Sequence, residues 1–201
     1  MELILVRHGV TELNNAGCFL GRTDCGLTPN GFQQAHRIKY LLQDTNFDCV
    51  YVSPLKRTMQ TADILDREYL ADNRLLEMNF GIFDGLAYSE IEKLYPEHLE
   101  AWNRDYRKYK IPDGESLDDV FGRVESFIKE NVKTYKRVLA VTHGGVIRCA
   151  LSLALLSREH FYRFQVDHGS LSYLEFNEYY SYIKAVNKNS MVKPECKKFL
   201  Y

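Results

Sequence analysis

The run of leucine, isoleucine and valine at 3–6 constrains the fold of this chain more than any other feature, because it is apolar on both faces. A strand without a polar side must be covered from both sides, as strands are in the parallel sheets of α/β proteins. Arg7, His8 and Gly9 follow the run directly. Open α/β sheets bind ligands beyond the carboxyl ends of their strands. This tripeptide is therefore predicted to lie at a binding site, where Gly9 lets the backbone approach the ligand.

The rest of the chain alternates short apolar runs with segments of helical periodicity. Strands are expected at 2–6, 48–52, 74–76 and 138–141, with two edge strands at 170–176 and 182–186. Helices are expected at 29–42, 54–69, 88–94, 96–109, 117–128 and 146–156. This order predicts a mostly parallel sheet with helices on both faces, a three-layer α/β/α sandwich.

Polar residues mark where three of these helices begin. Thr28-Pro29 and Ser53-Pro54 each combine an N-cap residue with proline at the first helical position. Ser116, with an aspartate three residues later, resembles a capping box. A helix that begins after Ser53 places Arg57 in its first turn.

The chain is expected to form a single domain over 1–201, with a small polar and aromatic helical lobe at about 86–112. The segment 10–27 is long for a loop, and long loops in compact domains are usually functional. The lysine-rich tail is expected to be held loosely.

Composition argues against several classes of function. The net charge is −1 and no basic block stands out, so neither nucleic acid nor a membrane surface is expected as a partner. The sequence shows no leader pattern and no apolar run of membrane-spanning length, so a cytoplasmic location is expected. The cysteines form no C-x-x-C pair and are expected to be free thiols: Cys18, Cys25, Cys49, Cys149 and Cys196.

Five groups with chemical potential are predicted to meet at one edge of the sheet: Arg7, His8, Arg57, Glu77 and His143. Guanidinium groups can bind phosphate oxygens bidentately, and an imidazole can attack phosphorus in line. The carboxylate or the second imidazole can protonate the leaving oxygen. These groups favour phosphoryl transfer on a small phosphorylated metabolite. The nucleotide-binding patterns G-x-x-x-x-G-K-[ST] and G-x-G-x-x-G do not occur.

Four motifs, in this order, resemble those of the histidine phosphatase superfamily, which has the phosphoglycerate-mutase-like fold. They are Arg7-His8-Gly9 with Asn14 shortly after, Ser53-Pro54-Leu55-Lys56-Arg57-Thr58, Glu77 before Phe80-Gly81, and Thr142-His143-Gly144. The resemblance extends from Leu3 to about Phe176. It implies a metal-independent phosphomonoesterase that needs no cofactor and works through a phosphohistidine.

The resemblance also implies a role for each site residue. His8 attacks phosphorus, Glu77 donates the proton, and the phosphoryl group is held by Arg7, Arg57 and His143 with help from Asn14. The other candidate residues for binding phosphate or substrate are Gly21, Gly144 and His168. No metal ligand is expected. The remaining histidines, which are His36, His98 and His160, are expected at the surface.

Within the superfamily the chain is similar to the α-ribazole phosphatases of cobalamin assembly. The likeness lies in Glu77–Gly81, Ala101–Arg104, Pro112–Ser116 and Phe164–Gly169. The short region after Glu77 favours a phosphatase over a mutase, because mutases usually carry a longer insertion there.

Three alternatives stay open at this point. The chain could be a mutase acting on a phosphorylated sugar acid, a broad-specificity phosphatase, or a binding module that grips phosphorylated ligands without catalysis. A zinc hydrolase is a further rival, although no H-E-x-x-H or similar spacing occurs. The oligomeric state is also open, with a homodimer as one alternative.

Overall fold

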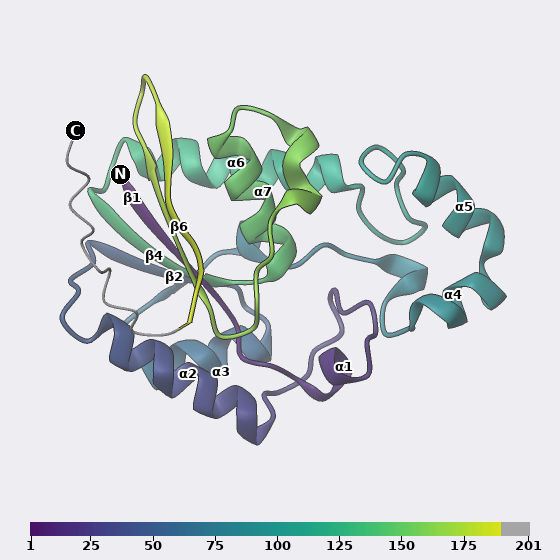
Figure 1. The fold of residues 1–201 in the computed structure, drawn as a ribbon, viewed down its shortest axis with the longest axis horizontal. Helices are drawn as coiled ribbons and strands as arrows, with labels where there is room; N and C mark the ends of the chain where they lie inside the picture. Colours follow the sequence, from purple (N-terminus) through teal and green to yellow (C-terminus); the bar gives the residue numbers. More distant parts are fainter. Residues whose placement is uncertain (190–201) are drawn as a thin grey trace, which may run out of the picture.

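The computed structural model describes residues 1–189, which form one mixed sheet with helices on both faces (Figure 1). The strands are β1 (Glu2–Arg7), β2 (Cys49–Val52), β3 (Leu70–Ala71), β4 (Arg137–Thr142), β5 (Leu171–Phe176) and β6 (Ser181–Lys188). Their order across the sheet is β3-β2-β4-β1-β5-β6. The pairs β3-β2, β2-β4 and β4-β1 are parallel, whereas β5 and β6 join as antiparallel strands at one edge. This confirms the predicted fold class, including the antiparallel edge.

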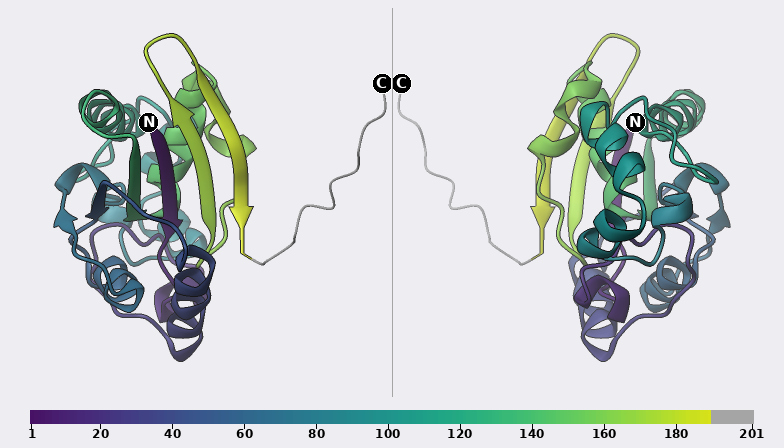
Figure 2. Two further views of the ribbon diagram at one scale, coloured as in Figure 1. Left: turned by 90° about the vertical axis from the view of Figure 1, so that its left-hand side faces the viewer. Right: turned by 90° about the vertical axis from the view of Figure 1, so that its right-hand side faces the viewer.

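Helices make up the outer layers and the connections. They are α1 (Glu12–Asn15), α2 (Pro29–Leu42), α3 (Lys56–Leu65), α4 (Tyr88–Leu94), α5 (Pro96–Arg104), α6 (Leu117–Val132) and α7 (Gly144–Ala154). Short 3-10 helices lie at η1 (Asn73–Leu75), η2 (Gly81–Phe83) and η3 (Arg158–Arg163). The pair α2 and α3 covers one face of the sheet, and the pair α6 and α7 covers the other (Figures 1 and 2).

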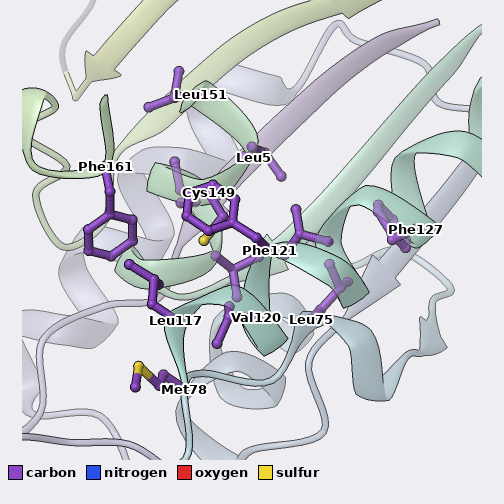
Figure 3. Close-up of a cluster of buried hydrophobic side chains, with 14 of the residues drawn as sticks. Leu5, Leu75, Met78, Leu117, Val120, Phe121, Phe127, Cys149, Leu151 and Phe161 are labelled. Atoms are coloured by element: carbon purple, nitrogen blue, oxygen red, sulfur yellow. The ribbon is translucent and has the colours of Figure 1, made fainter. Parts of the chain in front are cut away.

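The central strand β1 contributes to a core on each side of the sheet. Leu3 and Leu5 face the larger core, where they meet Phe121 of α6 and Cys149 of α7 (Figure 3). Ile4 and Val6 face the smaller core, which lies under α2 and α3. Because successive strand residues point to opposite faces, a strand that serves two cores must be apolar throughout, as the 3–6 run predicts.

The two helices of the predicted lobe, α4 and α5, lie side by side at the right of Figure 1, apart from α2 and α3. Their inward residues Ile91 and Leu99 join the larger core, and Trp102 packs edge-on against Phe19 and Phe83. Aromatic packing of this kind fixes the lobe to the long loop that follows β1.

Three expected elements differ from those in the structure. The second crossover helix begins at Lys56 rather than at Pro54, and it ends at Leu65 because Asp66 adopts the left-handed conformation with φ of 57°. The segment expected as a strand at 74–76 is the 3-10 helix η1, and the short strand lies earlier, in β3. The helix expected to reach residue 109 ends at Arg104.

The capping box at Ser116 is confirmed, since its side chain accepts from the Asp119 N–H and its own N–H donates to Asp119. Thr28 caps α2 as predicted. The end of the predicted tail, with Cys196, lies outside the described residues. Among residues 1–189 the helices are all too short or too polar to cross a membrane.

Two glycines mark a close approach between the loop after β1 and helix α2. A Cβ atom on Gly9 would lie 2.3 Å from the Gly31 carbonyl oxygen, and one on Gly31 would lie 2.4 Å from the Val10 carbonyl oxygen. The close approach found at Gly9 is thus to the backbone of α2, and it holds the start of the loop against the helix.

This contact predicts opposite effects for two glycine-to-alanine changes in helices. Gly122→Ala in α6, where a Cβ meets open space, should raise the free energy of unfolding by about 0.5–1 kcal/mol. Gly31→Ala should lower it by about 1–3 kcal/mol, because the backbone of Val10 must move. Urea unfolding of both variants measures the difference. Equal stabilisation by both changes would contradict the close contact.

Candidate active site

The parallel pairing of β1 with β4 brings two histidines together. Arg7 stands opposite Thr142 at the end of the ladder, and the His8 N–H donates to the Thr142 carbonyl at 3.0 Å. The residues that follow each strand, His8 and His143, therefore lie side by side, with ring centroids 5.1 Å apart. Both are almost fully buried, with 3% and 0% of their surface exposed. This meeting of the two rings was predicted from the strand ends alone.

The hydrogen bonds of His8 define its tautomer. Its Nδ1 lies 2.7 Å from the Gly9 carbonyl oxygen, which can only accept, so Nδ1 carries the hydrogen. Burial, together with the nearby charges of Arg57 and Arg7, holds the pKa of His8 well below its usual range. The ring is thus neutral at neutral pH, and its Nε2 carries a lone pair. An imidazole in this state is a nucleophile.

His143 is bonded to a residue for which sequence analysis predicted another role. Its Nε2 lies 2.7 Å from the Ser53 hydroxyl, so Ser53 contacts the site histidine instead of capping α3. Ser53 directly follows β2, so the strand-end rule that located the histidines could have located it too. The pKa of His143 is also held well below its usual range, chiefly by burial and then by Arg57.

Arg57 is buried and Arg7 is partly buried, and both are bonded to neutral partners. Arg57, in the first turn of α3, is 0% exposed and donates to the carbonyl oxygens of Gly21 at 2.7 Å and Thr23 at 3.0 Å. Arg7 donates to the Val166 carbonyl at 2.5 Å. Burial is the largest cause that lowers the pKa of both arginines, to about 10 for Arg7. Both remain cationic at neutral pH.

His168 joins the site because β5 runs antiparallel to β1. An antiparallel strand enters the sheet at the edge where β1 leaves it, and His168 lies just before this entry. Its Nε2 lies 2.7 Å from Arg7 Nη2, and because a guanidinium only donates, the histidine accepts. Burial and the charge of Arg7 lower the pKa of His168 to about 3, so this ring is neutral as well.

Glu77 follows η1 and is fixed by two backbone donors. Its carboxylate accepts from the Met78 N–H at 2.9 Å and from the Gly145 N–H, near the start of α7, at 3.1 Å. A Cβ on Gly145 would lie 2.3 Å from a Glu77 oxygen, and one on Gly144 would lie 3.2 Å from the guanidinium of Arg7. The two glycines therefore let α7 approach both charged groups closely.

A cavity of about 360 Å³ opens beside these residues. Arg7, Asn14, Glu77, Gly144 and Gly145 line one part of it. The remainder is mainly aromatic and apolar, and its single cation is Arg148. Its aromatic residues are Phe19, Phe80, Trp102, Tyr106, Phe161 and Tyr162. A cavity of this volume suits a small ligand. Sequence analysis did not predict that Arg148 or these aromatic residues line the site.

The other residues singled out from the sequence also have clear positions. The Asn14 side chain accepts from the backbone and hydroxyl of Thr11, which closes the turn at α1, while the residue also lines the cavity. Gly21 donates its N–H to Asp84 and its carbonyl holds Arg57, so a contact between Gly21 and phosphate stays a prediction. His36 is exposed, whereas His98 and His160 are partly buried.

Three buried side-chain atoms at the site have no hydrogen-bond partner among the described residues: Arg7 Nε, Arg57 Nε and His143 Nδ1. All three belong to the residues predicted to hold a phosphoryl group. Buried polar groups are rarely left without a partner, so such atoms are candidates for ligand contacts. Within residues 1–189 no group of three His, Cys, Asp or Glu side chains is arranged to hold a metal ion.

The sequence model of the histidine phosphatase superfamily (branch 1) matches residues 3–189. The chain belongs to this superfamily. Phosphoserine phosphatase 1 of Hydrogenobacter thermophilus is 32% identical to it over 196 residues, covering 93% of this chain and 92% of the relative. The human 6-phosphofructo-2-kinase/fructose-2,6-bisphosphatase 1 is 35% identical over 156 residues, which cover 77% of this chain but only 32% of that enzyme.

A solved structure confirms the fold. The α-ribazole phosphatase of Shigella flexneri superimposes with a TM-score of 0.86 at 30% identity, covering 94% of this chain and 98% of that one. As a member of the histidine phosphatase superfamily with relatives named as phosphatases, the protein is a phosphoric monoester hydrolase. These relatives are named for different substrates, so their names do not identify a single substrate.

Proposed function

We propose that the protein is a metal-independent phosphomonoesterase that forms a phosphohistidine on His8 Nε2. The observation that carries the proposal is the hydrogen bond from His8 Nδ1 to the Gly9 carbonyl, because it leaves Nε2 as the unprotonated nitrogen. The charges of Arg7 and Arg57 act on this ring and help to depress its pKa, and guanidinium groups are the side chains that bind phosphoryl oxygens bidentately.

The reaction proceeds in two displacement steps. His8 Nε2 attacks phosphorus, the bond from phosphorus to the ester oxygen breaks, and protonated Glu77 gives its proton to that oxygen. Water then attacks the phosphohistidine, Glu77 takes the proton from the water, and inorganic phosphate leaves. Arg7 and Arg57 supply positive charge and donors for the phosphoryl oxygens in both steps, and His143 Nδ1 supplies a neutral donor.

The substrate we favour is α-ribazole 5′-phosphate, and the site is proposed to act on it in the cytoplasm. The similarity to the Shigella flexneri α-ribazole phosphatase supports this choice, and the aromatic part of the cavity suits a heterocyclic base. One observation favours a second candidate. Arg148 lines the same cavity as Glu77, and its cation suits the carboxylate of phosphoserine, the substrate in the name of the Hydrogenobacter thermophilus relative.

Replacing His8 should abolish the covalent intermediate. His8→Ala is expected to lower kcat for a phosphomonoester by at least about 10³-fold, because the other two histidines at the site use their Nε2 in hydrogen bonds with Ser53 and Arg7. Acid-labile, base-stable label from ³²P-substrate should appear on the wild type and on His36→Ala, an exposed control in α2, but not on His8→Ala. Undiminished label on His8→Ala would refute the assignment.

Glu77→Gln should discriminate between leaving groups. The amide keeps an acceptor for the Gly145 N–H but cannot supply a proton, so esters of alkyl alcohols should lose about 10²-fold or more in kcat. Hydrolysis of p-nitrophenyl phosphate should fall only a few-fold, since its leaving group departs without protonation. Equal losses on both esters would assign the proton donor elsewhere, with His143 as the first candidate.

A panel of esters tests the substrate. With excess EDTA present, α-ribazole 5′-phosphate is expected to give a higher kcat/KM than phosphoserine, 3-phosphoglycerate or p-nitrophenyl phosphate. Phosphoserine as the best ester would favour the second candidate and leave the reaction type intact. The phosphatase proposal fails if 3-phosphoglycerate with catalytic 2,3-bisphosphoglycerate yields 2-phosphoglycerate faster than any ester in the panel releases phosphate.

A further inference from the structure

A three-residue loop lies between the carboxylate of Asp84 and the guanidinium of Arg57. The carboxylate, at the end of η2, accepts from three consecutive backbone N–H groups, at 2.8 Å from Gly21, 2.7 Å from Arg22 and 2.9 Å from Thr23. The carbonyl groups of Gly21 and Thr23 in turn accept from the two terminal nitrogens of Arg57.

The polarity of the loop suits its two charged neighbours. N–H groups meet the anion and C=O groups meet the cation. The peptide between Gly21 and Arg22 spans the two charges, because its C=O accepts from Arg57 and its N–H donates to Asp84. Charge-assisted hydrogen bonds are stronger than neutral ones, and each strengthens its neighbour through polarisation. Removing the carboxylate would leave three N–H donors without an acceptor and would release the carbonyls that hold Arg57.

The loop is also held against the segment that carries the predicted proton donor. A Cβ atom on Gly21 would lie 2.4 Å from the Met78 carbonyl oxygen, so the two backbones are in direct contact next to Glu77. A shift of the loop would therefore alter the position of Arg57 relative to Glu77 as well as to His8.

We propose that Asp84 is a positioning residue that fixes Arg57 for phosphate binding through the loop Gly21–Thr23. The proposal rests on the proposed function, because it assigns the phosphoryl contact to Arg57. Burial is the main cause that lowers the pKa of Arg57, and Asp84 is among the acidic groups that oppose this effect. The carboxylate thus also helps to keep the buried guanidinium charged.

A double-mutant cycle separates a positioning role from a purely structural one. The four proteins are wild type, Asp84→Asn, Arg57→Lys and the double variant. For each protein, calorimetry gives the Kd for inorganic phosphate and hydrolysis of p-nitrophenyl phosphate gives kcat/KM. Asp84→Asn should lower kcat/KM by about 10–100-fold, the range in which small displacements of catalytic groups act. If Asp84 acts through Arg57, the double variant should be no worse than Arg57→Lys alone.

A matched control comes from the opposite end of the sheet. Asp48 also accepts from two consecutive backbone N–H groups, those of Lys136 and Arg137, where β4 begins. Asp48→Asn should therefore remove a similar brace without changing phosphate binding or kcat/KM. If Asp84→Asn does not fold, Asp84→Glu takes its place in the cycle, because it moves the carboxylate by one methylene.

The outcomes distinguish a failure of the role of Asp84 from a failure of the proposed function. If the two single losses in kcat/KM multiply in the double variant, or if Asp84→Asn binds phosphate as tightly as the wild type, the role of Asp84 is wrong and the proposed phosphatase function is unaffected. A wild type that neither binds phosphate nor hydrolyses p-nitrophenyl phosphate would overturn the proposed function, and the role of Asp84 with it. If the losses in kcat/KM do not multiply, and Asp48→Asn keeps the wild-type kcat/KM and phosphate affinity, the positioning role is supported.

Discussion

The parallel alignment of β1 with β4 is the constraint on which the rest of the site depends. With Arg7 paired to Thr142, the two strands end together and their next residues are the two histidines. A slip of one residue would move His8 by about 3.3 Å along the strand and turn it to the other face of the sheet. The contact between the imidazole rings would then be lost. Catalytic geometry in this protein is therefore a consequence of strand register.

The two arginines of the site keep their charge available because their partners are neutral. Arg57 is held by two carbonyl oxygens, and Arg7 by one carbonyl and a neutral histidine. A carboxylate bonded to either guanidinium would cancel the charge that a phosphate dianion needs. Asp84, the acidic group that supports Arg57, instead acts through the backbone of Gly21–Thr23. Carbonyl groups thus hold both guanidinium groups in place, although the burial of Arg57 and the partial burial of Arg7 disfavour their charged forms.

Much of this site could be predicted from sequence because it depends on local signals. An apolar run that is followed by a histidine predicts both a strand and the chemical group at its end, as at His8 and His143. Arg57 lies in the first turn of the helix that follows a third strand, β2. The boundaries failed where a local signal was ambiguous. Ser53-Pro54 has the composition of a helix cap, but its hydroxyl is bonded to His143, and the helix begins two residues after the proline. Serine at a strand end and serine at a helix start look alike in sequence.

The rest of the site could not be predicted, because it depends on backbone groups that any residue possesses. The carbonyls of Gly21 and Thr23 that hold Arg57 leave no mark in the side-chain pattern, and the Val166 carbonyl that holds Arg7 leaves none either. Only where the backbone must come unusually close does the sequence keep a trace, as a glycine. Gly145 against Glu77 and Gly21 against Met78 are such traces, and both mark segments that carry charged groups into contact. Once a fold class is in hand, glycines outside turns are therefore the positions at which to look for backbone contacts that order a site.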